Sequence, residues 1–252
     1  MRALVTGASR GGIGGAIAKR LARDAWARRE DASIVLSATG DNPDLKLLAE
    51  DLEELGASVR TLPGDLLDPD VPAMLARHAA GFCGGGLDLV VSNAGRSQRV
   101  PLTQASLADW DDAMTLHARA AWLLAKAAYG FLVASGGSFI ATGSVTGTLP
   151  HAGKGAYPVA KAALIMTCQT LALEWAPSGV RVNVVSPGLI STEGSPKPDA
   201  GEVVPLGRGG LPEDVAGVVA FLAGPDAGFI TGQNILADGG LLGAGLERVR
   251  RG

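Results

Sequence analysis

The fold is decided by residues 1–27, which read MRALVTGASRGGIGGAIAKRLARDAWA. The apolar run Ala3–Val5 predicts a short buried strand, and the apolar spacing of Ile13–Ala27 predicts a helix. Between them lies Thr6–Gly14, whose glycines allow a sharp turn and a close approach of the backbone to a ligand. A strand, a glycine-rich turn and a helix in this order predict the first unit of a parallel α/β sheet.

The remainder of the chain repeats this alternation of short apolar runs and longer amphipathic stretches. Because parallel strands need crossover connections, the alternation predicts a doubly wound α/β sheet of about seven strands with helices on both faces, as a single domain over residues 1–252. The strands are expected at Ala3–Val5, Ser33–Leu36, Val59–Leu62, Leu87–Val91, Ser138–Ala141, Arg181–Val185 and Asn234–Ala237. The helices are expected at Ile13–Ala27, Pro43–Leu55, Val71–Ala80, Trp110–Ala134, Ala156–Trp175 and Pro212–Leu222. Two segments stand apart: Ala25–Asp31 is expected to form a surface extension, and residues 246–252 a flexible or intersubunit tail.

The composition is that of an ordinary globular chain. Hydrophobic residues make up 47% and charged residues 19% of the sequence, so a packed core is expected rather than disorder. The formal net charge is −3 and no basic block precedes the last few residues, which argues against a nucleic-acid partner. No apolar run approaches the roughly 18 residues of a membrane span, and no signal-peptide pattern opens the chain. We therefore expect a soluble, cytoplasmic protein with Cys83 and Cys168 as reduced, buried thiols and with no metal site.

The glycine-rich turn has the properties of a phosphate-binding loop. In open parallel sheets, ligands bind beyond the carboxyl ends of the strands. The N-terminus of the following helix offers free N–H groups and a partial positive charge to an anion. The position of Thr6–Gly14 therefore predicts that it binds the pyrophosphate of a dinucleotide, a flexible loop without a ligand being the alternative.

The residues after the second strand bear on which dinucleotide is bound. An NAD site usually has an acidic side chain there, which binds the ribose hydroxyls. This chain has Ser37-Ala38-Thr39-Gly40 and no acid before Asp41. Arg10 in the glycine loop is placed to face a 2′-phosphate, with Thr39 as a hydroxyl donor, so NADP(H) is favoured over NAD(H). The alternative is that Arg10 is a solvated loop side chain.

Ser144, Tyr157 and Lys161 form a second group of candidate residues. Ser144 follows the expected strand Ser138–Ala141, and Tyr157 and Lys161 are four residues apart on one face of the expected helix. A free phenol has a pKa of about 10, and a nearby ammonium together with the positive charge of an oxidised nicotinamide lowers it by favouring the phenolate. Tyr157 is therefore a candidate acid/base near neutral pH, with Ser144 as a hydrogen-bond donor to a substrate oxygen. A helix with a packed tyrosine and a solvated lysine is the alternative.

Taken together, these motifs resemble those of the short-chain dehydrogenase/reductases. The resemblance extends over nearly the whole chain, in the family's order and spacing, and rests on Thr6-Gly7…Gly12-Ile13-Gly14, Asp65-Leu66, Asn93-Ala94-Gly95, Ser144, Tyr157-x-x-x-Lys161, Pro187–Thr192 and Thr231-Gly232-Gln233…Asp238-Gly239-Gly240. It implies a Rossmann-type fold and a nicotinamide-dependent oxidoreductase that interconverts a carbonyl and an alcohol. The segments Ser37–Thr39 and Pro205–Arg208 look most like those of the NADPH-dependent 3-oxoacyl-[acyl-carrier-protein] reductases.

The resemblance also implies a role for each matching residue. Tyr157 would be the acid/base, Lys161 would lower its pKa and hold the nicotinamide ribose, and Ser144 would orient the substrate carbonyl. Family members usually form dimers or tetramers, so a homo-oligomer is implied as well. The expected cofactor-binding residues are Gly7, Ser9, Arg10, Gly12, Ile13, Gly14, Thr39, Asp65, Leu66, Asn93, Ala94, Gly95, Tyr157, Lys161, Pro187, Gly188, Ile190 and Thr192.

Two features near the expected site depart from the family pattern. The glycine loop has one extra residue, which leaves open whether Gly11 or Gly12 lies nearest the phosphates. Many family members have an asparagine in the helix after Trp110, and its backbone carbonyl holds a water in a proton relay to the lysine; this chain has His117 there. A histidine could relay protons itself, because its free pKa is about 6.5, or it could only pack. In either case His117→Asn is expected to retain substantial activity.

A third departure concerns the substrate side. The segment after Thr192 is short, which suggests an open pocket or one that another subunit completes. Gln98 and His151 are expected pocket residues by position, although a histidine in such a loop is often no ligand contact. A 3-oxoacyl thioester, a small cyclic or aromatic ketone and a sugar or polyol all remain open as substrates.

Two functions of other classes also remain open: a non-catalytic NADP-binding sensor, and a cofactor-independent lyase on the same fold. Such proteins typically lose part of the tyrosine, lysine or glycine motifs, and all three motifs are present in this chain.

Overall fold

The computed structural model describes residues 1–40 and 42–244. Its centre is a seven-stranded parallel sheet with the strand order β3-β2-β1-β4-β5-β6-β7. The order reverses between β1 and β4, as in doubly wound folds, which confirms the α/β class. The strands are β1 (Arg2–Thr6), β2 (Ser33–Ser37), β3 (Ser58–Thr61), β4 (Leu89–Ser92), β5 (Ser138–Thr142), β6 (Arg181–Pro187) and β7 (Asn234–Ala237). The tail expected at residues 246–252 lies outside the described residues.

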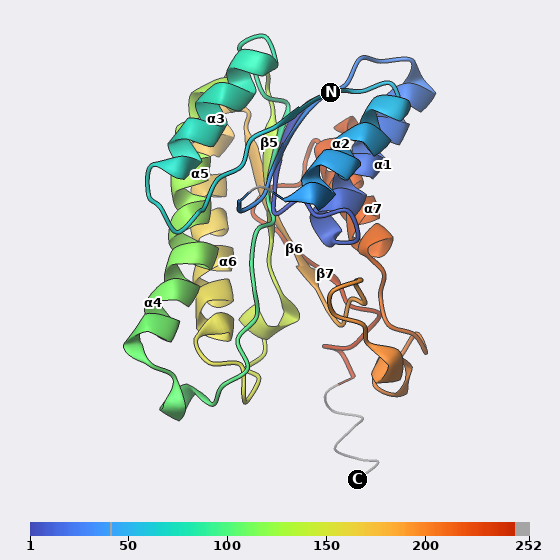
Figure 1. The fold of residues 1–252 in the computed structure, drawn as a ribbon. Coiled ribbons are helices and arrows are strands. Elements are labelled where there is room, and N and C mark those ends of the chain that lie inside the picture. Colours follow the sequence, from blue (N-terminus) through green and yellow to red (C-terminus); the bar gives the residue numbers. More distant parts are fainter. Residues whose placement is uncertain (41, 245–252) are drawn as a thin grey trace.

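Helices form a layer on each face of the sheet (Figure 1). One layer holds α3 (Val71–Phe82), α4 (Leu107–Met114), α5 (Ala120–Val133) and α6 (Tyr157–Trp175). The other holds α1 (Ile13–Arg28), α2 (Pro43–Glu54) and α7 (Pro212–Ala223). None of the helices within the described residues is long and apolar enough to cross a membrane.

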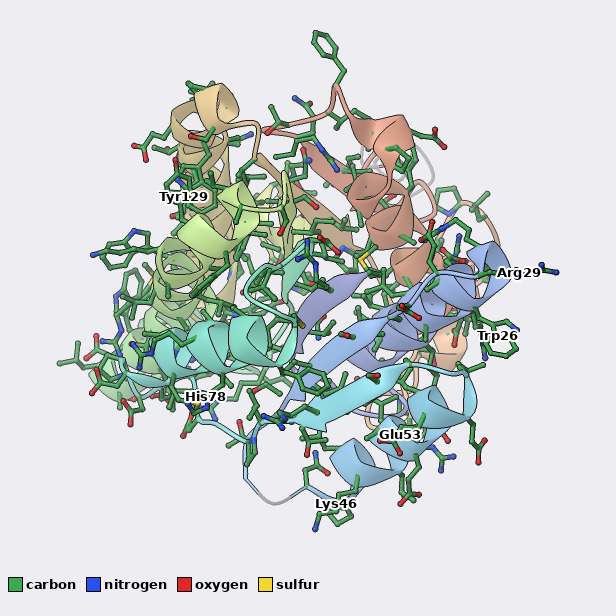
Figure 2. The ribbon with its side chains drawn as sticks, turned by 90° about the horizontal axis from the view of Figure 1, so that it is seen from above. Trp26, Arg29, Lys46, Glu53, His78 and Tyr129 are labelled. Carbon is green, nitrogen blue, oxygen red and sulfur yellow. The ribbon has the colours of Figure 1, made fainter. Side chains whose placement is uncertain are left out.

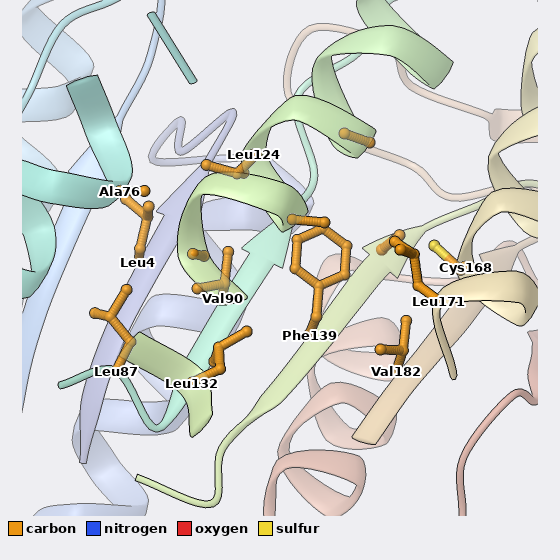
Figure 3. Packing of buried hydrophobic residues seen from close by; sticks show 14 of the residues in the cluster. Leu4, Ala76, Leu87, Val90, Leu124, Leu132, Phe139, Cys168, Leu171 and Val182 are labelled. Carbon is orange, nitrogen blue, oxygen red and sulfur yellow. The ribbon is translucent and has the colours of Figure 1, made fainter. Parts of the chain in front are cut away.

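Alternate residues of the same strands build the two halves of the core. Leu4 and Val90 pack under α3 and α5, whereas Val5 and Val91, the next residues along, pack under α1 and α7. Phe139 of β5 is fully buried at the centre of the first half (Figure 3). Successive side chains of a strand point to opposite faces, so a sheet covered on both faces needs unbroken apolar runs, as the sequence has.

Helix α1 is longer than expected. It continues to Arg28, one residue past the expected end, so the first half of the expected surface extension Ala25–Asp31 is helical; Ala25 is buried, whereas residues 26–31 are exposed as expected. Trp26 lies on the outer side of the molecule, near the end of α2 (Figure 2). A Cβ atom at Gly56 would lie 2.9 Å from the Trp26 ring, which shows how closely the two segments approach.

The helix expected at Trp110–Ala134 is divided into α4, a π-helical turn at Thr115–Arg119, and α5. It begins at Leu107 because Ser106 and Asp109 form a capping box, in which each side chain accepts a hydrogen bond from the other residue's backbone N–H. A π-helical turn inside an α-helix is rare and often lies at a functional site. This one contains His117.

Candidate active site

The carboxyl ends of all the strands share one edge of the sheet, because the sheet is parallel. The segments after β4, β5 and β6 extend below the sheet in Figure 1. A cleft of about 300 Å³ at this edge is lined by residues that follow β1, β2, β3 and β4. Among its lining residues are the expected cofactor-binding residues Gly7, Ser9, Thr39, Asp65, Leu66, Ala94 and Gly95.

The glycine loop is held by contacts that leave no room for side chains. Gly7 has a φ of 63°, and a Cβ atom there would lie 2.5 Å from Cα of Ala94. A Cβ atom at Gly14 would lie 2.5 Å from the Gly7 carbonyl oxygen. Gly12 is the N-cap residue of α1, whose first turn has neither a side-chain cap nor an acidic residue. The N–H groups at this helix end are therefore available to the oxygens of a phosphate.

Asn93 ties three strand ends together. Its side-chain amide donates to the carbonyl oxygens of Thr6 and Gly7 at 3.2 and 3.0 Å, and its Oδ1 accepts from the Thr142 hydroxyl at 3.0 Å. The Asn93 backbone N–H also donates to Thr6 Oγ1. Its side chain thus supports the loop from beneath, while the next two residues, Ala94 and Gly95, line the cleft.

Arg10 is held by a carboxylate on α2. Its guanidinium donates to both carboxylate oxygens of Asp51 at 2.8 and 2.9 Å, and Lys19 Nζ lies 2.8 Å from the same group. These two cations lower the pKa of Asp51 to about 2. The side chain expected to face a 2′-phosphate is therefore ion-paired in this structure, whereas Thr39 lies in the cleft wall.

Tyr157, Lys161 and Ser144 come together beside the cleft, as the sequence pattern predicts. Lys161 Nζ lies over the Tyr157 ring, 5.7 Å from its centroid, and donates to the Thr142 carbonyl oxygen at 2.6 Å. Ser144 is buried after β5, and its Oγ lies 2.9 Å from Oγ1 of Thr146. Helix α6 begins at Tyr157, so Tyr157 and Lys161 lie in its first two turns and face the end of β5.

Burial controls the ionisation of these groups. It raises the pKa of Tyr157, an effect that a hydrogen bond with Ser144 opposes. It lowers the pKa of Lys161 to about 8. Lys161 alone does not lower the Tyr157 pKa; its ammonium lies against the ring face and donates to Thr142, and the combined effect with an oxidised nicotinamide stays a prediction.

The lowered pKa of Lys161 predicts a pH dependence of stability. An unfolded lysine has a pKa of about 10.4. Below pH 8 both states hold the proton and the native state carries the full cost of the buried charge; that cost disappears as the pH rises from about 8 to about 10.5. Over this window the unfolding free energy of the wild type should therefore rise by up to about 3 kcal/mol relative to Lys161→Met.

Denaturant unfolding at several pH values measures this difference. Lys126→Met, which removes an exposed lysine of α5, is the control and should follow the wild type across the window. Parallel curves for the wild type and Lys161→Met would contradict the prediction.

His117 is enclosed next to this group. Its side chain is buried, its Nε2 lies 2.9 Å from the Arg96 carbonyl oxygen, and its ring stands edge-on to Tyr157 with 5.0 Å between centroids. Burial, and then the positive charge of Lys161, lower its pKa to about 3. The ring is therefore neutral near neutral pH, and a relay by a titrating histidine does not fit these surroundings.

The two expected pocket residues have other partners. Gln98 accepts a hydrogen bond from the Ala156 N–H at 2.9 Å and donates to the Asp109 carbonyl oxygen, so it fixes the start of α6 to the loop after β4. His151 is exposed, and its Nδ1 lies 2.6 Å from the Ala152 carbonyl oxygen. In this structure the Gln98 side chain is used in hydrogen bonds to the backbone, and the His151 side chain lies on the surface of its loop.

The segment Pro187–Thr192 leaves the end of β6 toward the cleft side of the sheet. A Cβ atom at Gly188 would lie 2.8 Å from Cα of Asp238, so the segment packs directly on the residue that follows β7. Ile190 is buried and pairs with Gly210 in an isolated bridge. These contacts hold the expected nicotinamide-binding segment against the sheet.

Three residues near the site carry no motif. A Cβ atom at Gly11 would lie 2.5 Å from a carboxylate oxygen of Glu193, so this acid lies beside the glycine loop. Asp51 binds the loop arginine, and Thr142 accepts the hydrogen bond of Lys161. Thr142 could have been predicted near the site, because it is the last residue of β5 and strand ends meet at the cleft. No sequence pattern predicts that Glu193 or Asp51 lies beside the glycine loop.

Known proteins match this chain over nearly their full length. Residues 7–242 match the family described as enoyl-(acyl carrier protein) reductase. The 3-oxoacyl-[acyl-carrier-protein] reductase FabG of Vibrio cholerae is 35% identical over 247 residues, which cover 95% of this chain and 96% of that protein. The protein of the same name from Escherichia coli is 36% identical with the same coverage.

Solved structures give the same result. Acetoin dehydrogenase YohF from Salmonella typhimurium has a TM-score of 0.87 at 29% identity, over 97% of this chain and 98% of that one. A short-chain dehydrogenase/reductase from Serratia marcescens has a TM-score of 0.84 at 29% identity, over 95% and 97%. The sheet order, the motifs and these matches agree, and the chain belongs to the short-chain dehydrogenase/reductase family.

Proposed function

We propose that this chain is an NADP(H)-dependent oxidoreductase that reversibly reduces a ketone or 3-oxoacyl group to a secondary alcohol. The observation that carries the proposal is the grouping of the buried Lys161 and Ser144 with the half-buried Tyr157, beside a glycine-lined cleft. Burying an ammonium opposes folding, as the lowered pKa of Lys161 indicates. A buried charge that opposes folding and lies next to a cleft is typical of a catalytic site.

The residues of the cleft fit a nicotinamide dinucleotide. A Cβ atom at Gly7 or Gly14 would meet backbone at 2.5 Å, so the loop is a bare backbone cradle in front of a helix N-terminus. Asp65 and Leu66 would hold the adenine, and Pro187–Thr192 the nicotinamide. The bound dinucleotide supplies a hydride, which no side chain of the protein can supply.

The side chains then handle the proton. In the reducing direction Tyr157 donates its phenolic proton to the substrate oxygen, to which Ser144 donates a hydrogen bond. Burial keeps Tyr157 protonated before the transfer, since it raises the phenol pKa. The Lys161 ammonium over the tyrosine ring would favour the phenolate together with the positive charge of the oxidised nicotinamide, since Lys161 alone does not lower the Tyr157 pKa. In the oxidising direction the phenolate takes the proton from the alcohol.

The preference for NADP(H) rests on two observations. Thr39 lines the cleft and no acidic side chain follows β2 at Ala38 or Gly40. Arg10 is the cation within the glycine loop, and its pairing with Asp51 keeps it near α2. A phosphate on the adenosine ribose would compete with Asp51 for this guanidinium.

Absorbance assays with NADPH and NADH against a panel of ketones and acyl thioesters test the proposal. Turnover with NADPH, at a lower KM than with NADH, is the expected result. Tight cofactor binding without turnover of any substrate would favour a sensor, and turnover of a halohydrin without cofactor would favour a lyase. A strong preference for NADH would overturn the assignment of Arg10 and Thr39.

Three cationic side chains on the loops around the site bear on the substrate. The Gly155 N–H donates to the Val100 carbonyl oxygen at 2.7 Å, which places Arg99 next to Lys154. Burial, and then the positive charges of Arg99 and Lys197, lower the pKa of Lys154. In the part of the chain that the structure describes, neither Arg99 nor Lys154 forms an ion pair. Unpaired cations that repel one another favour a substrate with an anionic group.

Matched substrates measure this preference. With 3-oxobutanoate and 3-oxobutanoyl-coenzyme A, Arg99→Gln and Lys154→Gln should each raise KM about tenfold, because a hydrogen bond to a charged group is lost. With neutral ethyl 3-oxobutanoate, KM should stay within about twofold. Lys126→Gln, on the outer face of α5, is the control. An effect only with the coenzyme A thioester assigns the cations to a carrier phosphate, and equal effects on all three substrates would contradict the prediction.

The expected dimer or tetramer stays a prediction. Trp122, Met166 and Leu173 on α5 and α6 are 42%, 63% and 80% exposed. A depression of about 560 Å³ lies between α4, α5 and α6, and it is lined by none of the residues Ser144, Tyr157 and Lys161. Exposed apolar surface of this kind is typical of an interface, and we propose a second copy of the chain as its partner.

A further inference from the structure

The Nδ1 atom of His117 is a buried polar atom without a hydrogen-bond partner among the described residues. The side chain is 2% exposed and lies in the π-helical turn between α4 and α5. Buried polar atoms nearly always have a partner, because leaving one without costs the desolvation of that atom. The unpartnered Nδ1 atom beside Tyr157 therefore indicates a hydrogen-bond partner from outside the protein, which is either a donor or an acceptor.

The other ring nitrogen, Nε2, shows whether the partner of Nδ1 is a donor or an acceptor. Nε2 lies 2.9 Å from the carbonyl oxygen of Arg96, which can only accept a hydrogen bond, so Nε2 carries a hydrogen. The groups whose charges act on the ring are the cations Lys161 and Arg96, and together with burial they lower the His117 pKa to about 3. Nδ1 therefore carries no hydrogen near neutral pH and is an acceptor.

The same arrangement prevents proton transfer through the ring. A proton taken up at Nδ1 could be passed on only if the hydrogen on Nε2 moved to the Arg96 carbonyl oxygen. The Arg96 carbonyl oxygen is not a base that accepts a proton near neutral pH. The ring can hold a hydrogen bond but does not conduct protons.

The unpartnered Nδ1 lies next to the cleft. A Cβ atom at Gly95 would lie 2.6 Å from Cε1 and 3.0 Å from Nδ1 of His117, and Gly95 itself lines the cleft. The Lys161 ammonium, whose charge acts on the ring, has three N–H donors, and the structure shows one hydrogen bond from it, to Thr142. Nδ1 thus lies beside the dinucleotide cleft, on a ring that packs edge-on against Tyr157.

We propose that His117 is a positioning residue whose Nδ1 accepts a hydrogen bond from an O–H donor at the edge of the site, and that its ring takes no part in proton transfer. The donor is a water bound in the free protein or a hydroxyl of the bound dinucleotide. By fixing this donor, His117 orients the groups that surround Tyr157 and Lys161. Its catalytic importance rests on the oxidoreductase function proposed above.

Nuclear magnetic resonance of protein labelled with ¹⁵N-histidine tests the tautomer directly. The chain has three histidines, and the exposed His78 and His151 serve as references in the same sample. The expected result is an Nε2–H tautomer of His117 that does not change between about pH 5 and pH 8, where an ordinary histidine titrates. Titration of His117 in this range, or an Nδ1–H tautomer, would overturn the proposal.

The same spectra identify the donor. A hydrogen-bonded Nδ1 resonance in the free protein assigns the donor to water. A change to the hydrogen-bonded position only after addition of NADP⁺ assigns it to a dinucleotide hydroxyl. An Nδ1 without a hydrogen bond in both states would overturn the proposal.

Two variants measure the effect on catalysis. His117→Phe keeps an aromatic ring against Tyr157 and removes the acceptor, so kcat should fall about tenfold; it also removes the Nε2–H bond to the Arg96 carbonyl oxygen, so the thermal unfolding temperature should fall as well. His117→Asn supplies a side-chain oxygen and should restore most of the loss. An unchanged kcat in His117→Phe would overturn the positioning role. A wild type without any turnover would instead overturn the proposed function and leave the tautomer result standing.

Discussion

Replacing Tyr157 with phenylalanine is expected to lower kcat about a thousandfold and to leave the dissociation constant of NADPH within about twofold. The hydroxyl is the proposed proton donor to the substrate oxygen, and general acid catalysis contributes roughly 10²–10⁴ to a rate. The ring that remains still packs edge-on against His117 and under Lys161, so the shape of the site is kept. Absorbance kinetics and a fluorescence titration of the cofactor separate the two effects.

Tyr129→Phe is the matched control, because Tyr129 is the other of the two tyrosines. Its hydroxyl lies 2.7 Å from Ser178 Oγ and its ring packs on Trp175, away from Ser144 and the cleft. This variant should keep its kcat and lose about 1 kcal/mol of stability with the hydrogen bond. If Tyr157→Phe kept more than a tenth of the wild-type kcat, the role assigned to the phenol would be wrong.

The second large effect is expected at Gly14, where alanine should lower the unfolding free energy by about 2 kcal/mol and the Tm by about 5 °C. The added Cβ atom would lie 2.5 Å from the Gly7 carbonyl oxygen and 2.8 Å from Nδ2 of Asn93. Both atoms belong to the hydrogen bonds that Asn93 makes beneath the loop, so these bonds must lengthen. Dinucleotide binding should weaken as well, because the loop moves.

Gly130→Ala is the control for this change. Gly130 lies in α5, and nothing lies within 4 Å of a Cβ atom there. Alanine is favoured over glycine in a helix by roughly 0.8–1 kcal/mol, so this variant should be slightly more stable than the wild type. Calorimetry on both variants and the wild type decides: a Gly14→Ala protein that unfolds no earlier than the wild type would refute the packing argument.

The sheet and the grouping of Ser144, Tyr157 and Lys161 were predictable because they depend on patterns that one sequence contains. Unbroken apolar runs indicate strands buried on both faces, and a parallel sheet brings the residues after each strand to one edge. Ser144 follows the last residue of β5, Thr142, by two positions and Tyr157 begins α6 thirteen positions later, yet both reach that edge because the strand ends there and the helix begins there. Their meeting follows from topology, without any knowledge of side-chain contacts.

The features that the sequence did not predict depend on contacts between distant segments. The ion pair of Arg10 with Asp51 joins a loop to a helix that follows another strand. The π-helical turn has no composition of its own, since Thr115–Arg119 reads as ordinary helix. The state of His117 depends on burial and on Lys161, which no local pattern reveals.

The fit of His117 against Gly95 also constrains how this chain can change over evolutionary time. A side chain at position 95 would meet the imidazole at 2.6 Å, so a larger residue there requires the ring to shift or to be replaced. Loss of the ring before the gain of a larger residue is therefore the less costly order of the two substitutions. Among relatives, a bulky residue at one position should therefore coincide with a small one at the other, and ancestral chains with both should be absent.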